Sequence, residues 1–304
     1  MSVRRVLGIL CCLMGLFSVA RQAWGTTNHI YVVASFTVLG DLVSEVGGDC
    51  VSVRALVGPD ADAHVYEPTP ADVRAVASAQ IVVLNGLGFE GWITRLLDSA
   101  QFRGSVVIAT TGVTARATGA HPDPHAWQDP RNVRTYVVNI ATALAAALPD
   151  HAAQIKTREA LYLHKLEDLD RTLRTEFGAI PNVRRRVITT HDAFSYFGAA
   201  YGIEFLPVQG WTTENEPSAA DVAGLVSQAR SHATTAVFLE NISDPRMMRQ
   251  LARDTGLTVG GRLHSDALAP PGQPSATYLD MIRNNANLLL GVMRQDSKPG
   301  SEAR

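Results

Sequence analysis

Short runs of β-branched and aliphatic residues alternate along the chain with longer stretches whose apolar residues recur at helical spacing. Eight of these runs are expected to form β-strands, and they fall into two groups of four. The first group comprises residues 30–34, 51–56, 81–84 and 106–109, and the second comprises 187–190, 203–206, 236–239 and 257–259. This alternation predicts an α/β fold with two doubly wound βα lobes, each a mostly parallel sheet covered on both faces.

Between the two groups, one apolar stripe extends over residues 150–177 at spacings of three, four and seven residues. Its members are Ile155, Tyr162, Leu166, Leu169, Leu173 and Phe177. Gly178 and Pro181 are expected to end the helix. A helix of about 28 residues is about 40 Å long, enough to span a two-lobed protein. We therefore predict an N-terminal lobe (26–149), a joining helix (150–178) and a C-terminal lobe (179–304) with a polar tail from Gln295.

The first 25 residues have the features of a cleaved signal peptide. Arg4 and Arg5 precede an apolar stretch at 6–20, and the segment Ala-Trp-Gly at 23–25 offers small residues to a signal peptidase. A transmembrane anchor would need about 20 apolar residues, and this stretch is shorter. A lipid anchor is not expected, because Cys11 lies inside the apolar stretch rather than after it. The sequence thus predicts an exported, periplasmic protein with no membrane insertion.

Cleavage would leave Cys50 as the one cysteine, so neither an intramolecular disulfide nor a cysteine-rich zinc site is expected. Any metal site must then be built from histidines and carboxylates. The mature chain would carry 24 basic and 29 acidic residues, a net charge of −5. That charge argues against nucleic acid and anionic membrane surfaces as partners.

Three histidines and one aspartate each follow the predicted end of a strand, and these are His64, His125, His191 and Asp266. Side chains at the carboxyl ends of strands in an open α/β sheet converge on one crevice. Three neutral imidazoles and one carboxylate make a complete four-coordinate shell for a borderline divalent ion, zinc above all. His121 shares the loop of His125. We expect only one of these two to bind metal and favour His125, which lies closer to the next helix.

A second motif, GLGFEG at residues 86–91, fits the GxGxxG pattern of dinucleotide-binding folds. It follows the third predicted strand rather than the first, and the next strand ends without the acidic residue that would bind a ribose. NAD binding is therefore not expected. The chain also has no GxSxG nucleophile elbow and no Walker A sequence.

Six segments in order, DADAHVYEPTPADV, NGLGFEGW, DPHAWQDPRN, TTHDAFSYF, VFLEN and GGRLHSDALAP, resemble the zinc- and manganese-type (cluster A-I) solute-binding proteins of bacterial ABC importers. The resemblance covers nearly the whole mature chain. It implies two lobes joined by a rigid backbone helix, with one metal ion in the interlobe cleft bound by His64, His125, His191 and Asp266. It also implies a monomer that catalyses no reaction and delivers the ion to an ABC permease and its ATPase.

The chain lacks the long His-rich loop that one branch of this family places between the first two ligands. Only the segment 114–124 is present, so an accessory loop for metal capture is not expected. Zinc is the expected ion. Manganese is the alternative, although members that resemble manganese carriers tend to place a carboxylate at the position of His191.

Two other classes of protein are alternatives. A zinc hydrolase would keep three protein ligands and an open position for water, with Glu67, Asp192 or Glu240 as general base. Asp266 in the fourth position argues against that activity. A surface adhesin is the other class, and no feature of the sequence supports it.

Overall fold

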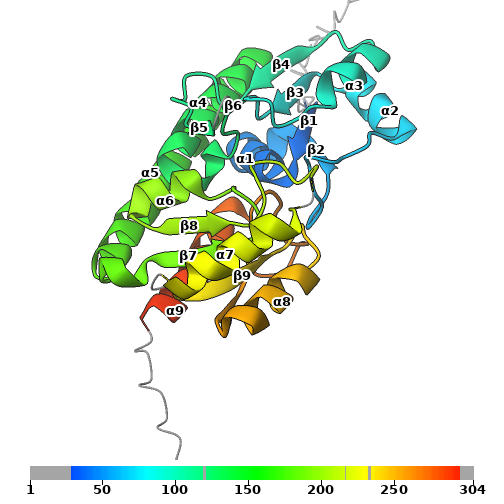
Figure 1. Ribbon diagram of the computed structural model, residues 1–304. Helices are drawn as coiled ribbons and strands as arrows, with labels where there is room; N and C mark the ends of the chain where they lie inside the picture. The colour runs from blue at the N-terminus through cyan, green and yellow to red at the C-terminus, as the bar shows by residue number, and fades with distance from the viewer. Residues whose placement is uncertain (1–28, 119–120, 216, 232–233, 295–304) are drawn as a thin grey trace, which may run out of the picture.

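The computed structural model describes residues 29–118, 121–215, 217–231 and 234–294. The predicted signal peptide (1–25) and the tail from Gln295 lie outside the described residues. Two four-stranded sheets form two lobes, one above the other in Figure 1. Every strand pair within these two sheets is parallel, as the alternating sequence pattern predicts.

The sheet of the N-terminal lobe has the strand order β2-β1-β3-β4. Its strands are β1 (Ile30–Phe36), β2 (Val51–Val57), β3 (Ile81–Leu84) and β4 (Ser105–Ile108). The lobe's helices are α1 (Thr37–Gly47), α2 (Pro70–Ser78), α3 (Ile93–Ser99) and α4 (Pro130–Ala147). Val32, Val33 and Ala34 on the central strand β1 are all fully buried. Consecutive buried residues on one strand show that both faces of the sheet are covered.

The sheet of the C-terminal lobe has the order β10-β9-β7-β8. Its strands are β7 (Arg186–Thr189), β8 (Glu204–Pro207), β9 (Ala236–Glu240) and β10 (Thr258–Leu263). The lobe's helices are α6 (Ser195–Tyr201), α7 (Ala219–Ser231), α8 (Arg246–Thr255) and α9 (Tyr278–Met293). Numbered within its own lobe, each sheet has the order second, first, third, fourth. The two lobes therefore share one topology, although the sequence has no fixed-period repeat.

Two features differ from the sequence-based expectation. The strand predicted at 257–259 extends to Leu263 as β10, with a change of register between Val259 and Gly261. The glycines at 260 and 261 interrupt the apolar pattern and hid the second half of this strand. The segment 114–124 contains a small antiparallel hairpin, β5 (Ala117–Thr118) and β6 (His121–Pro122), which was expected to be loop.

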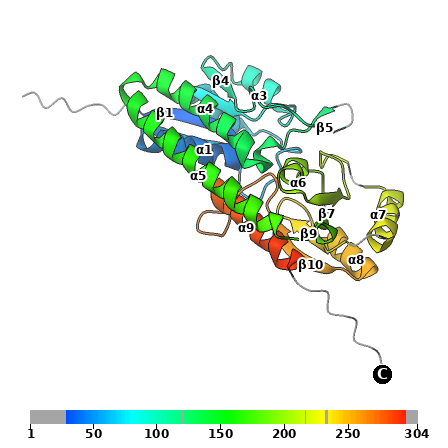
Figure 2. The same ribbon diagram turned by 90° about the vertical axis from the view of Figure 1, so that its left-hand side faces the viewer.

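The long helix α5 (Ala152–Gly178) runs beside both lobes (Figures 1 and 2). All six apolar residues of the predicted stripe are buried, so the periodicity is confirmed. The helix packs against α1 and α4 in the N-terminal lobe and against α6 and α9. Helix α9, close to the end of the chain, contacts α1 as well as α5 and β10. Two helices thus join the lobes, and the boundaries at 149/150 and 178/179 stay a prediction.

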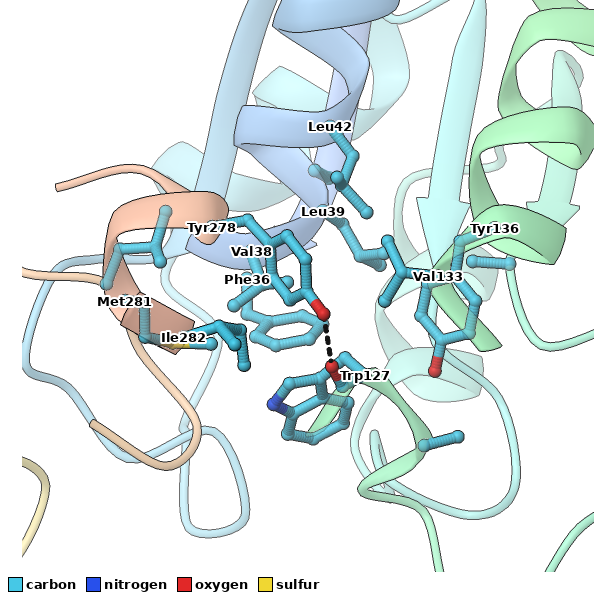
Figure 3. Packing of buried hydrophobic residues seen from close by; sticks show 14 of the residues in the cluster. Phe36, Val38, Leu39, Leu42, Trp127, Val133, Tyr136, Tyr278, Met281 and Ile282 are labelled. Atoms are coloured by element: carbon cyan, nitrogen blue, oxygen red, sulfur yellow. Dashed lines mark hydrogen bonds between the residues drawn. The ribbon is translucent and has the colours of Figure 1, made fainter. Parts of the chain in front are cut away.

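One hydrophobic core is shared between the lobes. It extends from the N-terminal sheet along α5 to α9 and into the C-terminal lobe, while a second, smaller cluster lies beneath α7 and α8. Figure 3 shows Phe36, Leu39 and Trp127 packed against Tyr278 and Ile282 of α9. Burial of one side chain of this size contributes about 1.5–3 kcal/mol. Separation of the lobes would expose part of this core.

No helix in the described ranges combines the length and the apolar character needed to cross a bilayer.

Candidate metal centre

The structure brings the four predicted ligands together between the two lobes. His64 follows β2, His125 precedes the 3₁₀ turn Ala126–Gln128, His191 follows β7 and Asp266 follows β10. Each offers one ligand atom, and these atoms all lie within 4.8 Å of one another. His64 is 7% exposed and the other three side chains are fully buried.

The carboxylate of Asp266 faces all three imidazoles. Its Oδ2 lies 3.1 Å from His64 Nε2 and 3.2 Å from His191 Nε2, and its Oδ1 lies 3.6 Å from His125 Nε2. Ligands about 2.0–2.1 Å from a tetrahedral zinc ion are about 3.3 Å apart. The Nε2 atoms of His64 and His191 thus lie close to a tetrahedral edge length from Asp266 Oδ2, while His125 Nε2 lies somewhat farther from the other oxygen.

The polar atoms that face this space lack hydrogen bonds of good geometry. They are the Nε2 atoms of His64, His125 and His191 and both carboxylate oxygens of Asp266. Burial of polar atoms without partners is unfavourable by about 1–3 kcal/mol for each group. A divalent cation at the centre would satisfy all of them, so the donor set fits a metal ion.

The charges of the site shift its proton equilibria. Burial alone would lower the pKa of His125, but the carboxylates of Asp266 and Asp123 outweigh it and raise this pKa to about 9. Burial likewise opposes protonation of His191, yet Glu240 and Asp266 hold its pKa well above the ordinary value. Burial would raise the pKa of Asp266, but His191 and His125 hold it well below its usual range. Protons and a metal ion therefore compete for the same imidazole nitrogens.

Two further carboxylates orient the histidines from behind. Asp123 Oδ1 lies 2.8 Å from His125 Nδ1 and also accepts the backbone N–H of His125 at 2.9 Å. Glu240 Oε2 lies 2.5 Å from His191 Nδ1. A carboxylate at Nδ1 keeps the proton there and leaves the Nε2 lone pair directed into the site, the usual arrangement around metal-binding histidines.

Asp123 was missed by the sequence reasoning, and Glu240 was considered only as a general base. A signal for each exists in the sequence. Asp123 stands two residues before His125 in the segment HPDPH, and Glu240 is the last residue of a strand, β9, that lies beside β7. An acidic residue at a strand end next to a predicted histidine ligand is a candidate for this orienting role.

The backbone around His64 is held at both ends. The indole N–H of Trp92 donates to the carbonyl of Ala63 at 2.9 Å, and Asp62 Oδ1 accepts the backbone N–H of His64 at 2.9 Å. The other oxygen of Asp62 accepts the hydroxyl of Thr213, from the opposite lobe, at 2.6 Å. The His64 loop is thus bonded across the cleft.

His121 lies on the β6 strand of the small hairpin and is exposed, outside the group of four. Its ring centroid is 5.8 Å from that of Trp211, which in turn is 6.2 Å from that of His64. Of the two histidines that share this loop, the structure groups His125 with the other candidate ligands.

The GLGFEG segment has a structural role beside the site. Gly86, Leu87 and Gly88 all have positive φ, so the chain turns sharply here. The carboxylate of Glu90 accepts the backbone N–H groups of Asn85 at 2.6 Å and Gly86 at 3.1 Å. The side chain of Asn85 then donates to the carbonyl of Pro124 at 2.9 Å. This turn therefore supports the residue that precedes His125.

Comparison with known proteins shows which family this chain resembles. The family described as zinc-uptake complex component A, periplasmic, matches residues 32–291. The manganese-binding lipoprotein MntA of Halalkalibacterium halodurans is 29% identical over 265 residues, covering 87% of this chain and 88% of MntA. The iron-binding protein YfeA of Yersinia pestis is 30% identical over 262 residues, covering 84% of each chain.

Solved structures agree in fold. The periplasmic zinc-binding protein TroA from Treponema pallidum superposes with a TM-score of 0.85 at 27% identity, covering 88% of this chain and 100% of TroA. A manganese-bound periplasmic metal-binding protein from Candidatus Liberibacter asiaticus gives 0.78 at 26% identity, with 87% and 99% covered. The chain thus belongs to the zinc-uptake complex component A family, the substrate-binding proteins of metal ABC transporters.

Proposed function

We propose that this protein is exported to the periplasm, binds one zinc ion through His64, His125, His191 and Asp266, and delivers it as a monomer to an ABC permease and its ATPase. The zinc ion is cargo, and no reaction is catalysed. Membership of a family of metal ABC transporter components supports the permease and the ATPase as partners. The names of the relatives, which include lipoproteins and periplasmic proteins, support export.

One observation carries the proposal. Three buried Nε2 atoms and two carboxylate oxygens face one small space without hydrogen bonds among them. Such an arrangement favours binding of a cation, because coordination would satisfy each of these buried atoms. Tight binding of one divalent ion per chain is the expected result.

The donor set supports zinc over manganese. Relatives are named for manganese, iron and zinc, so similarity to them does not by itself identify the ion. Three nitrogen donors suit zinc, whereas manganese prefers more oxygen donors. Manganese or iron is the second candidate, because both oxygens of Asp266 face the histidines. Bidentate binding by Asp266 would add a fifth donor and a second oxygen.

A hydrolytic role is not favoured by the surroundings of the site. Glu240, one of the candidate bases, is already engaged by His191 Nδ1 and by the backbone N–H groups of Thr190 and His191. A base must have a free oxygen within reach of a bound water. Glu240 instead orients His191 through its Nδ1 atom.

Native mass spectrometry of the purified mature chain, combined with metal analysis, tests the proposal. We expect one zinc ion per chain, and a large loss of affinity in Asp266→Ala. Growth tests the choice of ion in the cell: deletion of the gene should impair growth under zinc chelation, and added zinc should restore it. Rescue by manganese but not by zinc would assign the protein to manganese.

A further inference from the structure

The carbonyl of Ser265, directly before Asp266, accepts two side-chain hydrogen bonds. The indole N–H of Trp127 donates to it at 2.9 Å and the amide of Gln128 at 2.7 Å. Both donors are fully buried. They lie two and three residues after His125, in the N-terminal lobe, and reach across almost 140 residues of sequence. Two buried donors on one carbonyl leave that peptide group little freedom to rotate.

The direction of this carbonyl constrains the backbone from which the Asp266 side chain projects. The peptide group that joins Ser265 to Asp266 is planar, so fixing its oxygen fixes its plane. No sheet hydrogen bonds hold the segment, because β10 ends at Leu263. Trp127 and Gln128 therefore supply an orientation that regular secondary structure does not.

The loop is bonded to the N-terminal lobe on the far side of Asp266 as well. The backbone N–H of Leu268 donates to Thr37 Oγ1 at 2.8 Å, and its carbonyl accepts the N–H of Asp60 at 3.1 Å. By sequence Asp266 belongs to the C-terminal half of the chain. Its loop is hydrogen-bonded to both lobes, since Asn241 of the C-terminal lobe accepts the backbone N–H of Ser265 at 3.2 Å and donates to the carbonyl of Ala267 at 3.0 Å.

Trp127 is itself rigidly placed. Its ring packs against Phe36 and Phe89 with centroids 4.9 and 4.8 Å away. Its carbonyl accepts the hydroxyl of Tyr278 from α9 at 2.8 Å, the bond drawn in Figure 3. A fixed indole is what a precise hydrogen bond to Ser265 requires.

Resting on the proposed function, we propose that Trp127 and Gln128 are positioning residues for Asp266. Neither side chain is a candidate ligand. By holding the Ser265 carbonyl against the turn that follows His125, they keep the Asp266 carboxylate directed at the three Nε2 atoms. They thereby link a ligand loop of one lobe to a ligand loop of the other.

The test measures zinc dissociation into an excess of chelator, together with zinc affinity. Trp127→Phe removes the indole N–H, and Gln128→Met removes the amide donor at similar length. Each loses one buried hydrogen bond to the loop, so dissociation should be about tenfold faster. Tyr201→Phe is the control, since it removes a hydroxyl that donates to Asp170 at 3.1 Å, away from the proposed ligands. It should lower the unfolding temperature but leave zinc dissociation unchanged.

A double-mutant cycle with Asp266→Ala separates positioning of Asp266 from an effect through His125, whose ring lies 5.2 Å from that of Trp127. If Trp127 and Gln128 act through Asp266, their substitutions should have no further effect on zinc affinity once Asp266 is alanine. An equal loss of zinc affinity in both backgrounds would overturn the inference. It would also be overturned if zinc dissociated from Trp127→Phe and Gln128→Met as slowly as from Tyr201→Phe. A wild-type chain that binds no zinc, or an Asp266→Ala variant of unchanged affinity, would instead refute the proposed function.

Discussion

Glu240 Oε2 lies 2.5 Å from His191 Nδ1, while Glu240 Oε1 accepts the backbone N–H of the same histidine at 2.9 Å. One carboxylate thus fixes both the ring and the main chain of His191. Glu240 is the last residue of β9, and His191 lies two residues beyond the end of the neighbouring strand β7, so the sheet brings them together. This relationship makes Glu240 part of the candidate metal centre without making it a candidate ligand.

Replacement of Glu240 by alanine should weaken zinc binding by about 10- to 100-fold, because His191 loses the partner that keeps its proton on Nδ1. Competition with a chromophoric zinc chelator measures this affinity. Glu204→Ala is a matched control, since Glu204 lies in the same sheet on β8 but is exposed and pairs with Arg186. Equal affinities of the two variants would contradict an orienting role for Glu240.

Replacement of His191 by alanine should weaken zinc binding far more than replacement of His29 or His151. His191 is one of the four grouped side chains, whereas the other two lie outside the group. Titration calorimetry with each variant gives the comparison. Small and similar losses from His64, His125 and His191 as well as from the two controls would rule out the assigned ligands.

Zinc affinity should fall as the pH is lowered below about 9, and steeply between pH 7 and 5. Metal binding must displace protons from His125, whose pKa lies at about 9, and from His191, whose pKa is also raised. The metal-free protein should behave in the opposite way. A histidine pKa raised above the ordinary 6.5 adds stability below pH 6.5 that is lost as the pH rises through about 9. Thermal unfolding of metal-free samples over this range checks the sign of this change in stability. For zinc binding, an affinity independent of pH would mean that carboxylates dominate the site.

The substitution His191→Glu should shift the relative affinity from zinc toward manganese. It replaces one of three nitrogen donors with an oxygen donor, and manganese favours oxygen-rich coordination. The ratio of the two dissociation constants, measured in one buffer for both proteins, is the quantity to compare. An unchanged ratio would show that donor type at this position does not select the ion.

The lobes should move little when metal binds. They share one hydrophobic core, and both α5 and α9 pack against elements of each lobe. Opening the cleft widely would expose apolar surface at about 25 cal/mol per Å². X-ray scattering profiles of metal-free and zinc-loaded protein should nearly superimpose. A large change in the radius of gyration would contradict this expectation.

Local patterns in the sequence were enough to predict the eight strands, the buried stripe of α5 and the four grouped side chains. Strand and helix periodicity is a property of neighbouring residues, and parallel strands bring their carboxyl ends to one edge. Where glycines interrupted the periodicity, as at Gly260 and Gly261 in β10, the prediction stopped too early.

Only the tertiary structure revealed which residues hold the candidate ligands in place. Trp127 reaches Ser265 across 138 positions, and Glu240 reaches His191 across 49. No local periodicity encodes such contacts, because they depend on which strands become neighbours in a sheet and on how the two sheets dock. The same docking attaches the Asp266 loop to the N-terminal lobe, against its position in the sequence. Residue type and spacing therefore determined the chemistry of the candidate site, and long-range packing decided its geometry.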